Sequence, residues 1–235
     1  MAIENKKNID PTEVDKFNML AHKWWDPTSE FKPLHEINPL RVNVIKAKLS
    51  LEGKSILDVG CGGGILAEAL ALEGAIVTGI DQGDKVIKIA ELHNKESKLN
   101  INYKNMNIED FFKKNKEKYD VITCLEMLEH VPDPSSIIKT CAQLLKPQGR
   151  IFFSTLNRNP KSFLFAIVGA EYILKLLPKG THTYEKFITP AELRSWSSEV
   201  GLQFYDMIGM TYNPLTKIYS LTKDCSVNYL VEAGF

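Results

Sequence analysis

The 235-residue sequence lacks long apolar runs, paired cysteines and net charge. No segment approaches the roughly 18 consecutive apolar residues of a membrane-spanning helix, and the start, "MAIENKKNIDPTEV", has neither a signal core nor an Arg-rich amphipathic stretch. No C-x-x-C pair occurs among the four cysteines, Cys61, Cys124, Cys141 and Cys225, which indicates buried thiols in a reducing compartment. We therefore expect a cytoplasmic protein that is neither secreted nor membrane-spanning.

The charged residues balance, with 29 Lys and Arg against 29 Asp and Glu. No net field would attract the chain to phosphates, so a nucleic-acid partner is disfavoured. Apolar residues make up 44% of the chain, which is enough to bury a full core. The length suits one globular domain, or one domain with an elaboration.

From residue 54 onward, short apolar runs alternate with helical segments. The runs are "SILDVG", "AIVTGID", "INYKNMN", "YDVITC" and "RIFFSTL", and the helical segments are 63–73, 83–99, 109–115 and 134–145. This alternation predicts an α/β fold with a doubly wound, mostly parallel sheet covered on both faces by helices. Two later runs, "LQFYDMIGM" and "TKIYSLT", predict an antiparallel pair and bring the sheet to seven strands.

Helices are expected before the sheet and inside a late insertion. Asp10 has the position of an N-cap, with Pro11 at the first helical position and Glu13 placed to answer the cap; a second helix is expected after "NPLR". Residues 158–188 are about thirty more than a direct connection needs. The helix expected there is almost wholly apolar, so it either packs on the domain or a second copy, or lines a lipophilic pocket or touches a membrane.

A glycine turn follows the first predicted strand in "ILDVGCGGGILAEAL". Asp58, Gly60 and Gly62 begin the pattern D-x-G-x-G-x-G, which lets the backbone pass close under a ligand. A dinucleotide fold prefers G-x-G-x-x-G, and Ile65 stands where its third glycine belongs. A frame from Gly62 does reach Ala67, so the dinucleotide alternative stays open, as does a turn without a ligand.

Polar residues also follow the second and third predicted strands. Asp81 ends "VTGID", where its carboxylate can accept both hydroxyl protons of a ribose. "NMNIEDF" offers Asn107 and the backbone of Ile108 to an adenine edge. Together these features resemble the class I, Rossmann-like methyltransferases that use S-adenosylmethionine (SAM), in which the glycine turn faces the amino acid part of the cofactor. We expect Asp58 to support the turn and the cofactor's ammonium group.

Three ionisable residues lie together in "CLEMLEHVPDP", just after the fourth predicted strand. Glu126, Glu129 and His130 are spaced i, i+3, i+4, which on one helical turn would point them to the same side and create a site for Mg²⁺, Mn²⁺ or Zn²⁺. His130 is also a candidate general base. The alternative is that the glutamates cap the following turn and only His130 acts.

Longer blocks of the chain resemble the ubiquinone biosynthesis O-methyltransferase family. They run from Lys23 to Leu230 and comprise "KWWDPTSEFKPLHEINPLR", "LDVGCGGGILAE", "CLEMLEHVPDP", "FFSTLNRN", "VGAEYILKLLPKGTH" and "VNYL". The tryptophan-rich block and the "VGAEYILKLLPKGTH" insertion are the most specific. The departures are small: Leu125 stands where relatives are expected to have Met, and Gln148 interrupts a K-P-G-G turn.

The resemblance implies that the methyl of SAM passes to one hydroxyl of a polyprenylated catechol or hydroquinol, such as 3-demethylubiquinol or 2-polyprenyl-6-hydroxyphenol. It also implies that Arg41 binds the cofactor carboxylate, that Leu125 forms part of the cofactor wall, that Glu126 and His130 are catalytic, and that the ion is Mg²⁺.

The resemblance also suggests an organisation and partners. Segment 1–50 would cover the cofactor site, and 51–235 would form the methyltransferase domain. Segment 162–178 would contact the inner face of the membrane, and other ubiquinone-pathway enzymes are candidate partners. Three other functions stay open: methylation of another phenol or of carbon, a silent SAM-binding assembly factor, and a dehydrogenase.

Overall fold

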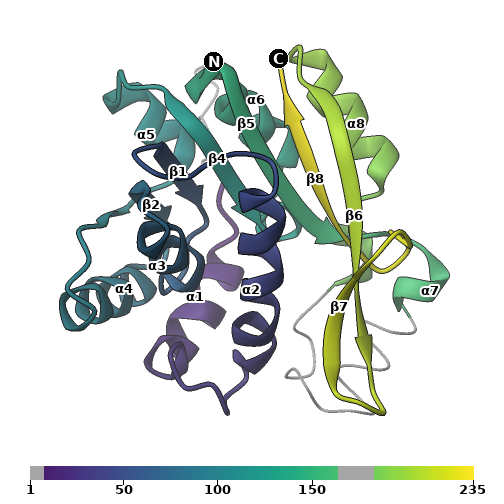
Figure 1. Ribbon diagram of the computed structural model, residues 1–235, viewed down its shortest axis with the longest axis horizontal. Helices are drawn as coiled ribbons and strands as arrows, with labels where there is room; N and C mark the ends of the chain where they lie inside the picture. The colour runs from purple at the N-terminus through teal and green to yellow at the C-terminus, as the bar shows by residue number, and fades with distance from the viewer. Residues whose placement is uncertain (1–7, 164–182) are drawn as a thin grey trace, which may run out of the picture.

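An eight-stranded sheet forms the centre of the computed structural model, which describes residues 8–163 and 183–235 (Figure 1). The strand order is β3-β2-β1-β4-β5-β8-β6-β7. The first five strands are parallel, β8 is antiparallel to β5 and β6, and β7 is antiparallel to β6. The strands are β1 (Ser55–Val59), β2 (Ile76–Asp81), β3 (Asn102–Asn105), β4 (Tyr119–Leu125), β5 (Leu145–Leu156), β6 (Gln203–Asn213), β7 (Ile218–Thr222) and β8 (Asn228–Gly234).

The sheet confirms the doubly wound prediction and adds one strand to the seven expected. The antiparallel pair formed by β6 and β7 is present, with Gly209 opposite Thr222 and Asn213 opposite Ile218. The additional strand is β8, which lies between β5 and β6. It is buried along almost its whole length, so its sequence lacks the alternation of apolar and polar residues that marks a half-exposed strand.

Helices cover both faces of the sheet. The α-helices are α1 (Pro11–Leu20), α2 (Lys32–Lys46), α3 (Ile65–Leu72), α4 (Asp84–Glu96), α5 (Ile108–Lys114), α6 (Pro134–Leu144), α7 (Pro160–Ser162) and α8 (Pro190–Glu199). The described residues also include the short 3-10 helices η1 (Ala21–Lys23), η2 (Leu128–His130) and η4 (Tyr184–Lys186). Apolar residues of α2, α3 and α4 pack on one face, and those of α5, α6 and α8 pack on the other.

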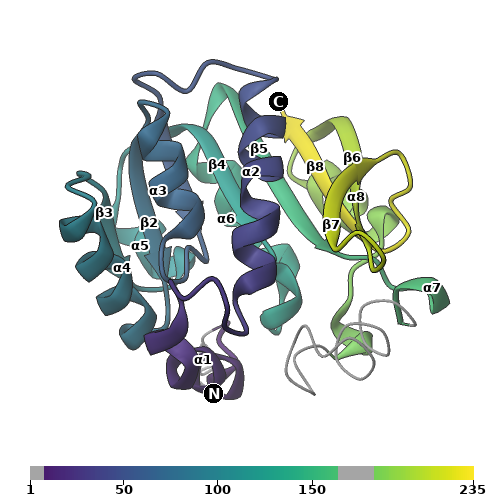
Figure 2. The same cartoon turned by 60° about the horizontal axis from the view of Figure 1, so that its bottom comes forward.

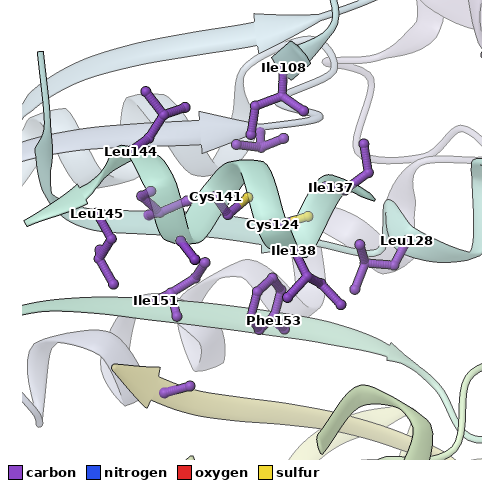
Figure 3. Packing of buried hydrophobic residues seen from close by; sticks show 14 of the residues in the cluster. Ile108, Cys124, Leu128, Ile137, Ile138, Cys141, Leu144, Leu145, Ile151 and Phe153 are labelled. Atoms are coloured by element: carbon purple, nitrogen blue, oxygen red, sulfur yellow. The ribbon is translucent and has the colours of Figure 1, made fainter. Parts of the chain in front are cut away.

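The core beneath α6 shows why this helix forms where the sequence predicted it. Asp133 caps its first turn by accepting from the backbone N–H of Ser136 at 3.2 Å, and Pro134 occupies the first position. Ile137, Ile138 and Cys141 are fully buried and belong to the same apolar cluster as Phe153 of β5, which lies beside Ile138 (Figure 3). This periodic apolar stripe buries the helix against the sheet.

Helix α2 runs along one face of the sheet, and α1 lies beyond one end of it (Figure 2). Asp10 caps α1 as predicted, through the backbone N–H of Thr12 at 3.1 Å. Helix α2 begins at Lys32, earlier than the predicted start after "NPLR", and contains Pro39 within it. Helix α1 packs against α4, and α2 packs against α3 and β7.

Some expectations concern residues that the structure does not describe. The apolar helix of the 158–188 insertion, and nearly all of the candidate membrane segment 162–178, lie outside the described residues. Within the ranges 8–163 and 183–235, no helix has both the length and the apolar character needed to span a membrane. The four cysteines are unpaired thiols, and Cys61, Cys124 and Cys141 are buried as predicted.

Candidate functional site

A cavity of about 710 Å³ opens between α1, α2 and the carboxyl ends of the central strands. Its volume lies within the range of small-molecule sites. All of the predicted cofactor and catalytic residues line it, whereas Glu129, predicted only as a metal ligand, does not. Those that line it are Arg41, Asp58, Gly60, Gly62, Asp81, Asn107, Leu125, Glu126 and His130. Parallel α/β sheets bind ligands at this edge.

The glycine turn after β1 is shaped by contact with Trp24. A Cβ atom on Gly62 would lie 2.1 Å from the Trp24 ring, and one on Gly63 would lie 2.4 Å from it. Gly62 also has φ +52°, in the left-handed region that favours glycine. The turn therefore needs glycine both for its backbone and for the indole that rests on it.

Trp25 fastens the same segment to the turn. Its Nε1 donates to the carbonyl of Gly63 at 2.9 Å, and its ring stacks on His93 with centroids 3.4 Å apart. His93 is in turn 2.8 Å from the Glu68 carboxylate. Both tryptophans belong to the "KWWDPTSEF" block, whose contact with the glycine turn is not apparent from the sequence.

Asp58 is a buried carboxylate in which only one of the two oxygens accepts a hydrogen bond. Thr123 Oγ1 donates to its Oδ1 at 2.7 Å, whereas Oδ2 has no hydrogen-bond partner. Burial raises the pKa of Asp58 to about 7. An unpaired buried oxygen in a ligand-sized cavity fits an ammonium group, which is the role predicted for this residue.

Asp81 joins the tip of β2 to the glycine turn. Its Oδ2 accepts from the backbone N–H of Gly62 at 3.0 Å, and its Oδ1 accepts from that of Gly83 at 2.8 Å. Burial raises its pKa, and these backbone donors oppose the shift. Each carboxylate oxygen has a further lone pair, so the group can still accept from ribose hydroxyls.

The side chain of Asn107 caps a helix, a role that was not predicted from the sequence. Its Oδ1 accepts from the backbone N–H of Asp110 at 2.7 Å and caps α5, while Nδ2 donates to the Asp110 carboxylate at 3.1 Å. The neighbouring Ile108 N–H is in the first turn, where helix donors lack intrahelical partners. The backbone N–H of Ile108 is therefore a better candidate than the Asn107 amide for a hydrogen bond to an adenine edge.

Arg41 and Glu126 form an ion pair in the cavity wall. Arg41 is only 5% exposed, and its Nη2 donates to Glu126 Oε1 at 2.8 Å, while its Nε is buried without a partner. The same Glu126 oxygen accepts from Ser154 at 2.7 Å and from Asn228 at 3.0 Å. Glu126 has φ +52°, an unusual conformation for a residue with a side chain and one that clusters at functional sites.

The predicted helical turn carrying Glu126, Glu129 and His130 is not present. Strand β4 ends at Leu125, and the left-handed backbone of Glu126 separates it from η2, which begins at Leu128. No group of three His, Cys, Asp or Glu residues is arranged to hold a metal ion in the part of the chain that the structure describes. The spacing prediction is wrong because the i, i+3, i+4 rule requires a continuous helix.

Glu129 is a buried carboxyl group with one oxygen that makes no hydrogen bond. It is 3% exposed; Thr155 donates to its Oε2 at 2.8 Å, and its Oε1 has no partner. Burial, followed by the charge of Glu126, raises its pKa to about 8. This carboxylate would suit a cation, but the imidazole of His130, the predicted third ligand, is bound elsewhere.

The partner of His130 is Glu13. His130 Nδ1 lies 3.0 Å from Glu13 Oε2, so Glu13 does not close a capping box as predicted. The two residues are 117 positions apart, so no local pattern in the sequence connects them. Glu13 is therefore a site residue, although its place in the sequence predicts only a helix cap.

Comparisons with known proteins agree with this geometry. A family model described as a methyltransferase domain matches residues 35–206. Ubiquinone biosynthesis O-methyltransferases from Pseudomonas savastanoi pv. phaseolicola and Pseudomonas putida are each 60% identical over 225 residues, covering 96% of this chain and 97% of the relative.

Solved structures with low sequence identity share the fold. Magnesium protoporphyrin IX methyltransferase from Synechocystis PCC 6803 with bound SAH has a TM-score of 0.70 at 22% identity, covering 95% of this chain and 99% of that one. A SAM-dependent methyltransferase from Thermotoga maritima, described as a possible histamine N-methyltransferase, has a TM-score of 0.65 at 15% identity, covering 95% and 98%. The fold is that of class I methyltransferases, and the extent of the similarity to the Pseudomonas proteins shows that the chain belongs to the ubiquinone biosynthesis O-methyltransferase family.

Proposed function

We propose that this protein transfers the methyl group of SAM to a phenolic hydroxyl of polyprenylated catechols or hydroquinols, of the 3-demethylubiquinol and 2-polyprenyl-6-hydroxyphenol type. The observation that carries the proposal is that the glycine turn, Asp58, Asp81 and His130 line one and the same cavity. The proposed SAM-binding residues and the proposed base therefore line the same cavity. The names of relatives at 60% identity support the substrate class.

The residues present fit SAM. Asp58 Oδ2 would accept from the ammonium group, Arg41 Nε would donate to the carboxylate, and Asp81 would accept from the ribose hydroxyls. Two of these atoms are buried and lack partners within the described residues, a condition that costs roughly 1–3 kcal/mol each unless a ligand relieves it. When bound, SAM supplies an electrophilic methyl group on a sulfonium.

His130 would accept the proton of the phenolic hydroxyl. A phenol with a pKa near 10 is ionised in only about one molecule in a thousand at neutral pH, so the site must help to form the oxyanion. The imidazole lies in the cavity wall and is a suitable base. Glu126, held by Arg41, Ser154 and Asn228, would fix the wall beside it.

The predicted Mg²⁺ now rests on the family resemblance, because its three expected ligands do not converge, and no step above uses an ion. Chelation tests it. Loss of turnover that Mg²⁺ restores, with SAM affinity unchanged, would establish the ion. Full turnover in chelator would leave His130 working as a base without a metal.

The N-terminal segment 1–50 is proposed to cover the cofactor, and 51–235 to form the catalytic domain. The contacts of Trp24 and Trp25 with the glycine turn support the cover. The apolar insertion within 158–188 is proposed to take the isoprenoid tail, since each buried methylene is worth roughly 0.8 kcal/mol.

The same insertion, through 162–178, would give a cytoplasmic protein a peripheral contact with the inner face of the membrane. There it would also meet other enzymes of the pathway. Support for both proposals comes from the apolar sequence of the insertion, in which only Glu171 and Lys175 are charged between Phe163 and Leu177.

Ligand-dependent stability, followed by turnover, tests the proposed function. SAM, and not NAD, should raise the melting temperature, which would dismiss the dehydrogenase. A short-chain demethylubiquinol should then be methylated. Stabilisation by SAM without methylation of any catechol would instead support the silent assembly factor.

A further inference from the structure

The side chain of Glu13 joins helix α1 to two distant parts of the chain. Its Oε2 is 3.0 Å from His130 Nδ1, and its Oε1 accepts from Lys186 Nζ at 3.3 Å. Lys186 also donates to Asp10 Oδ2 at 2.9 Å. The side chains of Glu13 and His130 are each only 15% exposed, so this is a sheltered pair and not a surface ion pair.

The contacts around His130 restrain its ring. Phe17, one helical turn after Glu13, meets the imidazole at 87° with centroids 5.2 Å apart. The backbone N–H of His130 donates to the carbonyl of Met127 at 3.0 Å. Glu13, Phe17 and His130 all line the cavity. Helix α1 thus contributes directly to the wall where the acceptor hydroxyl would be deprotonated.

Glu13 can act on His130 only as an acceptor. Glu13 Oε1 accepts from Lys186 Nζ at 3.3 Å, and Lys16 Nζ lies 3.7 Å from Oε2, so two ammonium groups keep the carboxyl group ionised. An ionised carboxylate has no proton to donate, so the hydrogen between the two groups must be on Nδ1. Nε2 is then the nitrogen that can accept a proton.

We propose that Glu13 is a positioning residue for methyl transfer, which holds the imidazole of His130 in the Nδ1–H tautomer so that Nε2 accepts the proton of the acceptor hydroxyl. This inference rests on the proposed function. In the step, the phenolic O–H bond breaks and the proton passes to Nε2. The oxygen forms a bond to the methyl carbon, and the electron pair of the broken C–S bond stays on sulfur. The positive charge of the sulfonium is replaced by that of the imidazolium.

Glu13→Gln tests this with little change of shape, because its amide can donate to Nδ1 and so favour the wrong tautomer. We expect kcat for an ordinary catechol to fall by at least about tenfold, within the contribution of a positioned base. KM and SAM affinity should stay within about twofold of wild type, and Glu13→Asp should recover part of the loss. Asp15→Asn, an exposed residue on the same helix with the same change of charge, is the matched control and should be unaffected.

A second acceptor separates positioning from tethering. A catechol with electron-withdrawing substituents is already ionised at the assay pH and needs no base, so Glu13→Gln should methylate it at nearly the wild-type rate. Equal losses on both catechols, or weakened SAM binding, would overturn the inference and make Glu13 a tether for α1. Wild-type kcat in Glu13→Gln would also overturn it. Failure of the wild-type enzyme on both catechols would instead refute the proposed function.

Discussion

Asp81 is the residue at which cofactor binding and local structure are most closely linked. We expect Asp81→Ala to weaken SAM binding by about 1.5–3 kcal/mol, the range for a hydrogen bond to a charged group. Titration calorimetry measures this. Glu91→Ala, which removes an exposed carboxylate from α4, should leave affinity unchanged. An unaltered Kd in Asp81→Ala would remove Asp81 from the ribose site.

Asp58 should make the stability of the ligand-free protein depend on pH. Its folded pKa of about 7 lies above the unfolded value near 3.9, so the native state binds more protons in this interval. The free energy of unfolding should therefore fall as pH rises from about 4 to about 7, and Asp58→Asn should lack that part of the fall.

Urea unfolding without SAM at several pH values measures the effect of Asp58 on stability. Glu129→Gln is the comparison variant, because the pKa of Glu129, about 8, extends its own loss of stability to higher pH. Parallel pH curves for wild type and Asp58→Asn would show that Asp58 does not resist ionisation in the folded protein.

The sequence predicts single residues well where a pattern fixes their place. Asp58, Gly60 and Asp81 follow strands whose ends meet at one edge, so their positions in the cavity were predictable. The partnership of Glu13 with His130 was not, because nothing local relates residues 117 positions apart. The left-handed backbone of Glu126 was hidden for a similar reason, since surrounding contacts sustain it.

At the scale of elements, the N-terminal cover and the glycine turn should be energetically coupled. Gly63→Ala places a Cβ against the Trp24 ring at 2.4 Å and should destabilise the fold by about 1–3 kcal/mol. In a Trp24→Ala background the ring is gone, so the same change should cost much less. A double-mutant cycle measured by urea unfolding gives the coupling energy. Additive effects would mean that the indole does not press on the turn.

The insertion yields a prediction about substrate tails. Phe165→Asp and Ile173→Asp, both outside the described residues, should reduce kcat/KM for a long-tailed substrate far more than for a tail-free catechol. A charged side chain would oppose burial of the tail. The ratio of the two values is the measurement, and equal losses on both substrates would make the helix simply part of the core.

Liposome binding separates the two versions of the insertion proposal. Binding that survives both substitutions would dismiss the membrane contact through 162–178. Two elements that follow the insertion in the sequence, α8 and β8, show how far sequence patterns can be used. Helix α8, with its capping box between Thr189 and Glu192, was predictable, whereas the burial of β8 removed the alternation that would have marked it.

For the whole molecule, the alternation of apolar runs and helical segments was sufficient to predict the layers of the fold. It could not place β8, because an antiparallel strand inserted between two others is a long-range choice. The helical turn expected for Glu126, Glu129 and His130 was wrong for a related reason, because a residue spacing specifies a helix face only after the local conformation is known.

The central claim concerns which atom receives the methyl group, and one experiment addresses it. The protein is incubated with SAM carrying a ¹³C-labelled methyl and a short-chain demethylubiquinol, and the product is examined by NMR and mass spectrometry, with His130→Ala in parallel. The account predicts one labelled methyl ether on a ring oxygen in the wild type and strongly reduced product in His130→Ala. Label on a ring carbon, or undiminished turnover in His130→Ala, would contradict it.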